Sequence, residues 1–440
     1  MPPATLSSTR RIHGWTDRRV TLMGLGRHGG GLGAARFLAD QGARVTISDA
    51  ANASSLSAAV AALADVPIQA MHFGGHDDRD FGSAEVVVVN PAVRPDHPCL
   101  RIARESGAMI TSEIELFLER CPARVIGVSG SNGKSTTATL LAEMLRAEGL
   151  RTWLGGNIGG SLLDPLDQVR ASDWVVLELS SFQLAHLNRG ARLPEISVIT
   201  NCTPNHLDWH GALAEYAAAK RRLLDCSAVV LNAHDPLVDS WRADCSGAPH
   251  TGWQLGRVPK LHVPGAHNRQ NAACAAAAAE MAGVAESAIC RTLAGFRGLE
   301  HRIEWVAEAN GRRFYNDSKA TSSGATIAAL AAVEGPVWLL AGGVSKGTDF
   351  DDLAAEAVKR TRGIAVFGQA RDLLRSSIQA RDANHPVRDS ETLAAAVAWC
   401  YEHASPGDAI LLSPACASFD QFDGFEDRGR KFVEMVRRLC

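Results

Sequence analysis

The sequence lacks the features that mark several protein classes. Its ten cysteines are at least 16 residues apart, so no closely spaced pair indicates a zinc site or a redox-active dithiol. Acidic and basic residues nearly balance, 48 against 45, so the net charge of −3 gives no bulk attraction for nucleic acid or an anionic membrane. No run of 18 apolar residues predicts a membrane-spanning helix. We therefore expect a protein of the reducing cytoplasm that binds any polyanion at a local site.

The 440 residues suffice for about three domains of ordinary globular composition. Short β-branched runs alternate with longer Ala- and Leu-rich stretches of helical period, which is typical of βα units and a mostly parallel sheet. The clearest predicted strands cover residues 19–23, 44–48, 85–90, 124–129, 173–178, 196–201, 228–232, 336–341, 363–368 and 408–413. The pattern restarts after Cys121-Pro122 and after the polar run 298–302. We therefore predict an α/β protein with domains at 1–120, 121–301 and 302–440.

A glycine-rich turn follows the first predicted strand. Gly24 and Gly26 begin a G-x-G-x-x-G pattern before a predicted helix, and Asp49 ends the next strand. Such glycines let the backbone approach an anion, and the acidic residue can bind a ribose. Arg27 adds charge that suits a diphosphate, and Asn90 after a four-valine strand would lie at the same sheet edge. The pattern alone leaves open an NAD(P)-dependent dehydrogenase or a turn without a ligand.

A second glycine loop, SGSNGKSTT at residues 129–137, lies between a predicted buried strand and a helix. In such loops backbone N–H groups wrap phosphates, a lysine binds the β- and γ-phosphates, and a hydroxyl binds Mg²⁺. Val128 stands where the strict pattern has its first glycine, so this loop is a variant. We predict a nucleoside-triphosphate site at Gly130, Ser131, Asn132, Gly133, Lys134, Ser135 and Thr136.

Candidate metal ligands follow the next two predicted strands. Glu178 ends a strand near the phosphate loop and could hold Mg²⁺, which prefers oxygen ligands. His206, Asp208 and His210 have the spacing of a zinc site, although the last two are more often helix caps or surface groups. Lys220 is one of three adjacent basic residues, which by pattern alone indicates a solvated helix face.

In the last third of the chain, three polar loops each follow an apolar strand. They are NDSKAT at 316–321, GGVSKG at 342–347 and SPACASFDQF at 413–422. In a parallel sheet all three would project from one edge. Each loop alone could be a simple turn, but together they could clamp a small carboxylate. The side chains that would do so are Lys319, Thr321, Lys346 and Ser418.

Taken in order, the motifs of this chain resemble those of the Mur ligases. They are IGVSGSNGKST at 126–136, GGNIG at 155–159, LELSSFQL at 177–184, the segment 201–206, GAHNRQNAA at 265–273, HR at 301–302, NDSKAT and LLSPACASFDQF. The resemblance covers nearly the whole chain, from Val20 to Cys440. It implies a monomer with a Rossmann-like N-terminal domain for the UDP of an acceptor nucleotide, a P-loop-type central ATPase domain and a Rossmann-like C-terminal domain for the amino acid.

The resemblance also implies roles for individual residues. The catalytic residues would be Lys134, Glu178, His206 and Lys220. Lys220 would be carbamylated, which reverses its charge and makes it an oxygen ligand. Two Mg²⁺ ions would be held by Ser135, Glu178, His206 and carbamylated Lys220. ATP would also contact Asn271, Arg302 and Asp317.

The two remaining substrates are assigned in the same way. The UDP substrate would be bound by Gly24, Gly26, Arg27, Asp49, Asn90 and Asn157. The incoming glutamate would be bound by Thr321, Lys346, Ser418, Phe419 and Phe425.

Within the family, the chain most resembles the ligases that add D-glutamate to UDP-N-acetylmuramoyl-L-alanine in peptidoglycan synthesis. The implied reaction uses ATP to convert the substrate carboxylate into an acyl phosphate, which the amino group of glutamate then attacks. Arg27, His28, Phe419 and the GGVSKG loop depart from the common pattern, so a ligase adding L-glutamate or a folylpolyglutamate synthase stays open. A dehydrogenase would leave the phosphate loop and the NDSKAT motif unexplained. A non-catalytic relative would not need to keep Lys134, Glu178, His206 and Lys220.

Overall fold

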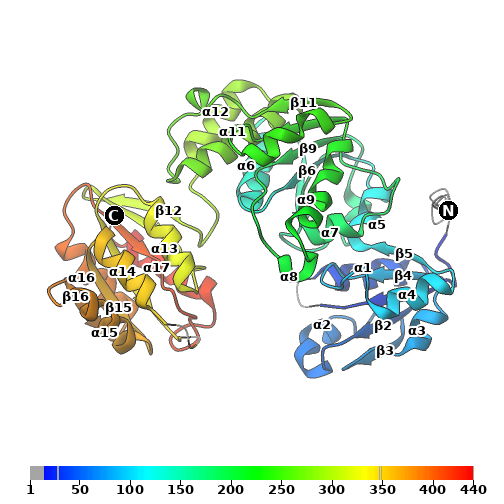
Figure 1. Cartoon of the computed structure of the whole chain (residues 1–440), viewed down its shortest axis with the longest axis horizontal. Helices are drawn as coiled ribbons and strands as arrows, with labels where there is room; N and C mark the ends of the chain where they lie inside the picture. Colours follow the sequence, from blue (N-terminus) through cyan, green and yellow to red (C-terminus); the bar gives the residue numbers. More distant parts are fainter. Residues whose placement is uncertain (1–13, 27–28, 346, 348, 440) are drawn as a thin grey trace. The chain divides into compact units, whose positions relative to one another are not determined.

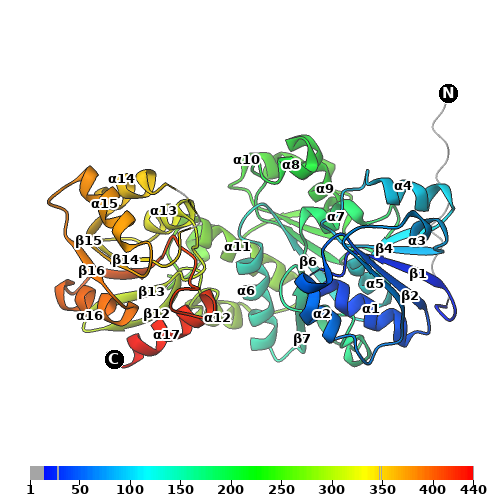
Figure 2. The ribbon, with the colours of Figure 1, turned by 90° about the horizontal axis from the view of Figure 1, so that it is seen from below.

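The computed structural model describes residues 14–26, 29–345, 347 and 349–439. Of the predicted site residues, Arg27 and Lys346 lie outside this part of the chain, as does the neighbouring His28. The described residues form three sheets with helices packed against them, which confirms the predicted α/β class (Figure 1 and Figure 2). None of the helices described is both long and apolar enough to cross a membrane.

The first sheet is parallel, with strand order β3-β2-β1-β4-β5. Its strands are β1 (Arg19–Met23), β2 (Arg44–Asp49), β3 (Ile68–Phe73), β4 (Val86–Val89) and β5 (Met109–Ser112). Its helices are α1 (Gly30–Asp40), α2 (Ser57–Ala61), α3 (Asp78–Gly82), α4 (Pro98–Glu105) and α5 (Glu113–Arg120). All four valines of β4 are buried, because this strand is inside the sheet and helices cover both faces.

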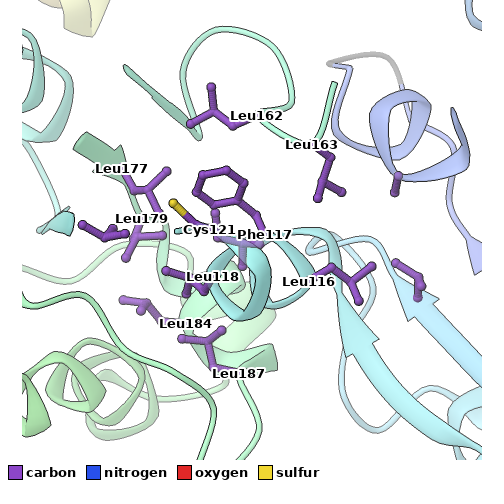
Figure 3. Packing of buried hydrophobic residues seen from close by; sticks show 14 of the residues in the cluster. Leu116, Phe117, Leu118, Cys121, Leu162, Leu163, Leu177, Leu179, Leu184 and Leu187 are labelled. Atoms are coloured by element: carbon purple, nitrogen blue, oxygen red, sulfur yellow. The ribbon is translucent and has the colours of Figure 1, made fainter. Parts of the chain in front are cut away.

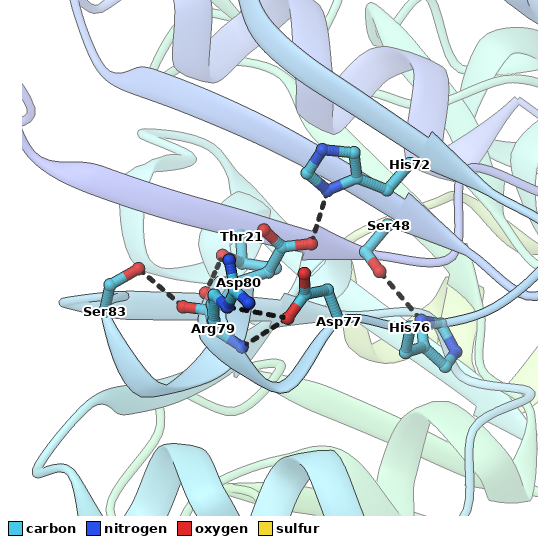
Figure 4. Close-up of polar contacts among 8 residues, drawn as sticks. All are labelled: Thr21, Ser48, His72, His76, Asp77, Arg79, Asp80 and Ser83. Carbon is cyan, nitrogen blue, oxygen red and sulfur yellow. Dashed lines mark hydrogen bonds and ion pairs between the residues drawn. The ribbon is translucent and has the colours of Figure 1, made fainter.

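Polar side chains anchor α3 to the neighbouring strands (Figure 4). The Thr21 hydroxyl of β1 donates a hydrogen bond to the Asp80 carbonyl at 2.6 Å, and the Asp80 carboxylate lies 2.7 Å from Nδ1 of His72 on β3. The Ser48 hydroxyl and His76 Nδ1 are 2.8 Å apart. These contacts fix the segment that follows β3 against the end of β2.

The central sheet is also parallel, with order β11-β10-β9-β6-β8-β7. Its strands are β6 (Arg124–Ser129), β7 (Thr152–Gly156), β8 (Trp174–Glu178), β9 (Ile196–Ile199), β10 (Ala228–Leu231) and β11 (Ala248–Thr251). The helices after them are α6 (Lys134–Ala147), α7 (Ser181–His186), α8 (Leu207–His210), α9 (Leu213–Arg221), α10 (Pro236–Asp239), α11 (Ala266–Met281) and α12 (Glu286–Gly295). The alanines at 272–279 of α11 are buried, as predicted for this Ala-rich tract.

Helix α5 joins the cores of the first two sheets (Figure 3). Its residues Leu116, Phe117 and Leu118 are almost fully buried. They belong to one continuous apolar cluster with side chains of the central domain, including Leu162, Leu163, Leu177, Leu179, Leu184 and Leu187. The two domains therefore share a hydrophobic core, which stabilises their contact.

The third sheet has the order β12-β13-β17-β14-β15-β16, with β12 antiparallel to β13 and the other pairs parallel. Its strands are β12 (Glu304–Ala309), β13 (Arg312–Asn316), β14 (Val337–Gly342), β15 (Thr361–Phe367), β16 (Val387–Ser390) and β17 (Ala409–Leu412). Its helices are α13 (Ser323–Ala332), α14 (Asp351–Arg360), α15 (Arg371–Arg381), α16 (Leu393–His403) and α17 (Phe425–Arg437). Successive residues such as Leu339 and Leu340 belong to different core clusters, because side chains alternate between the faces of a sheet.

The chain divides into two compact units. One comprises Met1–Gln254 and Gln270–Ile289, and the other comprises Leu255–Arg269 and Cys290–Cys440. Within the second unit His262 stacks on Trp305 with ring centroids 4.4 Å apart, which attaches the segment 255–269 to β12. The domain boundaries predicted after residues 120 and 301 stay a prediction.

Candidate active site

The predicted phosphate loop connects β6 to α6 and has two backbone positions that favour glycine. Gly130 and Gly133 have φ values of 153° and 79°. A β-carbon on Gly130 would lie 1.9 Å from Oγ1 of Thr200, and one on Gly133 would lie 2.3 Å from Oδ1 of Asn271. The structure therefore brings Asn271, which is buried, against the start of α6.

The loop encloses its lysine. The Lys134 ammonium group donates to the carbonyls of Gly130 at 3.1 Å and Ser131 at 3.0 Å. The Asn132 N–H donates to Oδ1 of Asn201 at 2.8 Å, which ties the loop to the residues after β9. A glycine loop that leads into a helix N-terminus and carries a lysine is suited to bind an anion.

A buried carboxylate lies beside the first turn of α6. The Ser135 hydroxyl donates to Oε2 of Glu178 at 2.6 Å, and the Asn157 amide donates to Oε1 at 2.9 Å. Glu178 lies at the end of β8 and is 2% exposed. Thr136, the predicted phosphate-site residue after Ser135, is partly buried in α6. Gly156 permits this approach, because a β-carbon there would lie 2.2 Å from the Glu178 carbonyl oxygen. The carboxylate and hydroxyl oxygens fit the donor preference of Mg²⁺.

Lys220 contradicts the interpretation of its helix face as solvated. Its side chain is buried within α9, where the ammonium group donates to the Gly130 carbonyl at 2.8 Å and lies 4.3 Å from the ring centre of Tyr216. Burial, with a smaller effect from Lys134, lowers the pKa of Lys220 to about 7. The reason is that α9 packs this face against the phosphate loop, and the Tyr216 hydroxyl donates to Ser131 Oγ at 2.8 Å.

The zinc-like spacing after β9 does not form a metal cluster. Among the described residues, no group of three His, Cys, Asp or Glu side chains is placed to hold one ion. His206 has a left-handed backbone (φ 53°) and lies with its ring 4.7 Å from that of Phe182. His210 stacks on the same ring at 5.6 Å and contacts the Ser181 hydroxyl at 2.9 Å. Asp208 lies in the short helix α8, so the spacing reflects a turn that packs aromatic rings.

In the first domain, the structure describes four of the residues predicted to bind the UDP substrate: Gly24, Gly26, Asp49 and Asn90. They converge at the carboxyl ends of β1, β2 and β4. The Gly26 N–H donates to one oxygen of Asp49 at 3.2 Å, and the Ala51 N–H donates to the other at 2.8 Å. The Asn90 amide donates to the Gly24 carbonyl at 3.2 Å. A β-carbon on Gly24 would lie 2.7 Å from that of Asn90, so these two loops are in close contact.

The glycine turn of the first domain also approaches the loop of the central domain that follows Asn157. A β-carbon on Gly29 would lie 4.0 Å from the α-carbon of Gly160, and one on Gly33 would lie 2.3 Å from the β-carbon of Ser161. The turn and Asn157 therefore belong to neighbouring loops of the same unit.

The other predicted ATP residues, Arg302 and Asp317, lie in the second unit. Asp317 is 7% exposed, and its carboxylate accepts hydrogen bonds from the Ser413 hydroxyl at 2.7 Å and the Ile303 N–H at 3.2 Å. Burial raises the pKa of Asp317 to about 7, while these hydrogen bonds and Arg302 act in the opposite direction. Arg302 and Asp317 are therefore neighbours at the end of β13.

The three C-terminal loops meet at one sheet edge, as predicted. Val344 and Ala417 form an antiparallel bridge, with N–H to carbonyl distances of 2.8 and 3.0 Å. Ser418 beside it is buried, whereas the side chain of Phe419 is 76% exposed. An exposed Phe419 does not contribute to a closed pocket within this unit.

The first of these loops approaches the start of α17. The Lys319 ammonium group lies 5.2 Å from the ring centre of Phe425. The Thr321 N–H donates to the Lys319 carbonyl at 2.9 Å, and Thr321 is partly buried. The structure thus brings the loop that carries Thr321 next to Phe425.

Three residues that support the site were not singled out from the sequence. Thr200 donates to the Asn132 carbonyl at 2.6 Å, Asn201 contacts the same residue, and Tyr216 lies under Lys220. The sequence does hold one signal, since Thr200 and Asn201 end a predicted strand, where side chains reach the neighbouring loop.

Three family models cover most of the chain. The model described as Mur ligase MurD-like, N-terminal domain matches residues 18–112, that of the Mur ligase middle domain matches 128–258, and that of the Mur ligase, glutamate ligase domain matches 301–416. Among solved structures, a UDP-N-acetylmuramate-alanine ligase from Thermotoga maritima is 19% identical, covers 96% of this chain and 99% of its own, and gives a TM-score of 0.54. A UDP-N-acetylmuramoyl-L-alanyl-D-glutamate–2,6-diaminopimelate ligase is 18% identical over 90% and 93%, with a TM-score of 0.58. At these identities the two structures show the shared fold alone.

Curated relatives match over nearly their full length. The UDP-N-acetylmuramoylalanine–D-glutamate ligase of Roseiflexus sp. is 39% identical, covering 95% of this chain and 98% of the relative. Those of Geobacillus kaustophilus and Symbiobacterium thermophilum are 38% and 37% identical, covering 97% and 96% of this chain and 98% of each relative. With the three-sheet fold and the intact phosphate loop, these matches show that the chain belongs to the Mur ligase family.

Proposed function

We propose that this chain is an ATP-dependent ligase that adds D-glutamate to UDP-N-acetylmuramoyl-L-alanine, a step of peptidoglycan precursor synthesis. The observation that carries the proposal is the phosphate loop, in which Ser135 donates to the buried carboxylate of Glu178. The curated D-glutamate ligases match this chain over nearly their full length. No observation favours L-glutamate addition or a folate substrate.

The proposed first step is attack of the acceptor carboxylate on the γ-phosphate of ATP, which forms an acyl phosphate and releases ADP. Two anions must approach each other, so the step depends on positioning and on offsetting charge. The Lys134 ammonium and the N–H groups at the start of α6 would do this at the phosphates. Mg²⁺, held by Ser135, Glu178 and His206, would supply further positive charge.

The second step forms the amide. The amino group of glutamate attacks the acyl carbonyl, the C–O bond to phosphate breaks, and the amine loses a proton. Thr321, Lys346, Ser418 and Phe425 are proposed to hold the glutamate, and Gly24, Gly26, Arg27, Asp49, Asn90 and Asn157 to hold the acceptor. Asn271, Arg302 and Asp317 are proposed to contact ATP.

We also propose that Lys220 is carbamylated. Its Nζ would attack CO₂, forming an N–C bond and releasing a proton, and the carbamate oxygens would then face the metal ions. This reaction needs the neutral amine, and burial lowers the pKa of Lys220 to about 7. The position next to Gly130 would place the carbamate beside the phosphate loop.

A cytoplasmic monomer is the proposed working form. The cysteines at nine described positions are free thiols, seven of them buried, which suits a reducing compartment where ATP is available. Size-exclusion chromatography with light scattering would test the monomer.

The test of the function is ADP release by the purified chain with Mg²⁺, ATP and UDP-N-acetylmuramoyl-L-alanine. D-Glutamate, L-glutamate and L-alanine are added in parallel. We expect turnover with D-glutamate alone. Turnover with L-glutamate would reassign the amino-acid site, and inactivity with all three would point to another acceptor, such as a folate.

Lys134→Ala is expected to lower ADP release at least a hundredfold, because the charge that meets the phosphates is removed. Lys359→Ala is the matched control, since Lys359 is exposed on α14 and pairs with Glu356. A Lys134→Ala protein that kept its rate would show that the assigned phosphate loop is wrong.

A further inference from the structure

Helix α17 buries an arginine in the C-terminal domain, and no proposed role in the reaction uses it. Arg428 has 0% of its surface exposed, which is rare for a charged side chain. Burial lowers the pKa of Arg428 to about 10, so the guanidinium stays charged at neutral pH. A buried charge is costly unless hydrogen bonds satisfy it, so the partners of Arg428 indicate what it does.

These partners lie on all three polar loops. Its Nε donates to the Ser318 hydroxyl at 3.0 Å, and one terminal nitrogen donates to the Ser318 carbonyl at 2.8 Å. The other terminal nitrogen donates to the carbonyls of Cys416 at 3.1 Å and Gly342 at 3.4 Å. One guanidinium thus joins the loops after β13, β14 and β17 through neutral oxygen atoms.

Two further contacts extend this network to predicted glutamate-binding residues. The Ser318 hydroxyl, which accepts from Arg428, donates to the Phe425 carbonyl at 2.8 Å. The bridge between Val344 and Ala417 joins the second and third loops one residue from Ser418. Arg428 itself is covered by these loops, so it cannot contact a bound amino acid from its buried position.

The planar fork of arginine explains why this residue serves here. Its donors point in fixed, divergent directions, so their acceptors must keep fixed relative positions. A lysine would retain the charge but would present donors from a single point. The loops also leave little space, because a β-carbon on Gly343 would lie 3.2 Å from Arg428.

We propose that Arg428 is a positioning residue for the amino-acid site: it holds the three loops in the mutual register that lets Thr321, Ser418 and Phe425 bind the incoming glutamate. This inference rests on the proposed function for the identity of the amino acid. It assigns no step of the chemistry to Arg428.

Steady-state kinetics of Arg428→Lys and Arg428→Met test the proposal. We expect the KM for D-glutamate to rise at least tenfold, with the KM for the UDP acceptor within twofold of wild type, because the predicted acceptor residues lie in the other unit. Partial unfolding alone would lower the apparent kcat and leave both KM values unchanged, and that result would overturn the proposal. Arg437→Met is the control, since Arg437 is exposed on the same helix.

Ser318→Ala provides a second variant without a change of charge. It removes one acceptor of Arg428 and the donor to Phe425, so its KM for D-glutamate should also rise. Because both variants break one network, the double variant Ser318→Ala/Arg428→Met should show less than the product of the two single effects. Fully multiplicative effects would contradict a shared network.

Hydrogen exchange without substrate separates this inference from the proposed function. In Arg428→Lys, amides in 316–321, 342–345 and 414–418 should exchange at least tenfold faster, with the sheet cores unchanged. If wild type failed to use D-glutamate, the proposed function would fall while this measurement still tested the loops. Exchange in the three loops equal to that of Arg437→Met would overturn the positioning role.

Discussion

Burial shifts two ionisable residues of the site, Lys220 and Asp317, toward their neutral forms. Lys220 in the central domain and Asp317 in the C-terminal domain have opposite charges when ionised, yet burial moves the pKa of each to about 7. Removal from water penalises the charged form of either group, which lowers the pKa of an amine and raises that of a carboxyl. Both groups therefore have a pKa close to neutral pH.

For Lys220 this leads to a quantitative prediction. Protein depleted of CO₂ should recover ADP release after bicarbonate is added, at a rate proportional to the neutral amine. With a pKa of about 7, the recovery rate at fixed dissolved CO₂ should rise about tenfold from pH 6 to pH 8, against about a hundredfold for an ordinary lysine. Lys220→Arg should show no recovery. A hundredfold rise would mean that the lysine is not perturbed.

At the level of the element, α6 shows how one helix can need glycine at both ends for different reasons. Gly133 before it and Gly149 after it have φ values of 79° and 83°. Gly149 has open space around its α-carbon, so only its backbone conformation favours glycine. Gly133 faces Asn271, so there the side chain of a larger residue would also clash.

This difference can be measured with a pair of substitutions. Gly149→Ala should lower the free energy of unfolding by about 1 kcal/mol, the cost of a left-handed alanine. Gly133→Ala should cost about 2–4 kcal/mol, because it adds the displacement of Asn271, and should raise the KM for ATP. Urea unfolding and ATP titration give both values. Equal destabilisation by the two variants would show that the contact with Asn271 is easily relaxed.

At the scale of the molecule, a buried polar contact accompanies the apolar junction of the first two domains. Glu115 on α5 is 2% exposed and accepts hydrogen bonds from the Asn188 amide at 2.9 and 3.0 Å. Burial raises the pKa of Glu115 to about 7, against the opposing effect of these hydrogen bonds. Between about pH 4.5 and pH 7, the folded protein therefore keeps a proton on Glu115 that the unfolded chain has lost.

Stability should consequently depend on pH through this group. Because the folded pKa of about 7 exceeds the unfolded value of 4.5, the Glu115 contribution to the unfolding free energy falls as pH rises from about 4.5 to 7. Glutamine does not ionise, so Glu115→Gln should not lose stability in this way. The unfolding free energy of Glu115→Gln minus that of wild type should therefore be larger at pH 8 than at pH 5, by at most about 3 kcal/mol. Denaturant unfolding at both pH values measures the difference, and a pH-independent difference would contradict the assignment.

Much of the fold could be predicted because central strands carry a strong signal. β4, β8 and β17 are buried on both faces and consist almost entirely of apolar residues. The strands absent from the prediction include the edge strands β11 and β16, whose sequences APHT and VRDS are largely polar or exposed. An edge strand is held by its neighbour's backbone, so its side chains need not show a pattern.

The site was predictable to the extent that it follows strands. The loops at the ends of β6, β8 and β17 were found from the pattern and lie where expected. The burial of Lys220 was not predicted from the pattern, because α9 has no clear apolar face and a lysine carries no sign of its environment in the sequence. Only the family resemblance singled out Lys220. The contact of Asn271 with Gly133 joins distant segments and leaves no local trace.

The connectivity of the two units has a consequence for cleavage. The chain passes between them three times, after residues 254, 269 and 289. One proteolytic cut at any of these crossings gives two fragments, and at least one of them carries residues of both units. A continuous fragment that starts at residue 290 would lack the segment 255–269. It would therefore also lack His262, whose ring stacks on Trp305. The C-terminal unit is therefore not a separable tail but is interlaced in sequence with its partner.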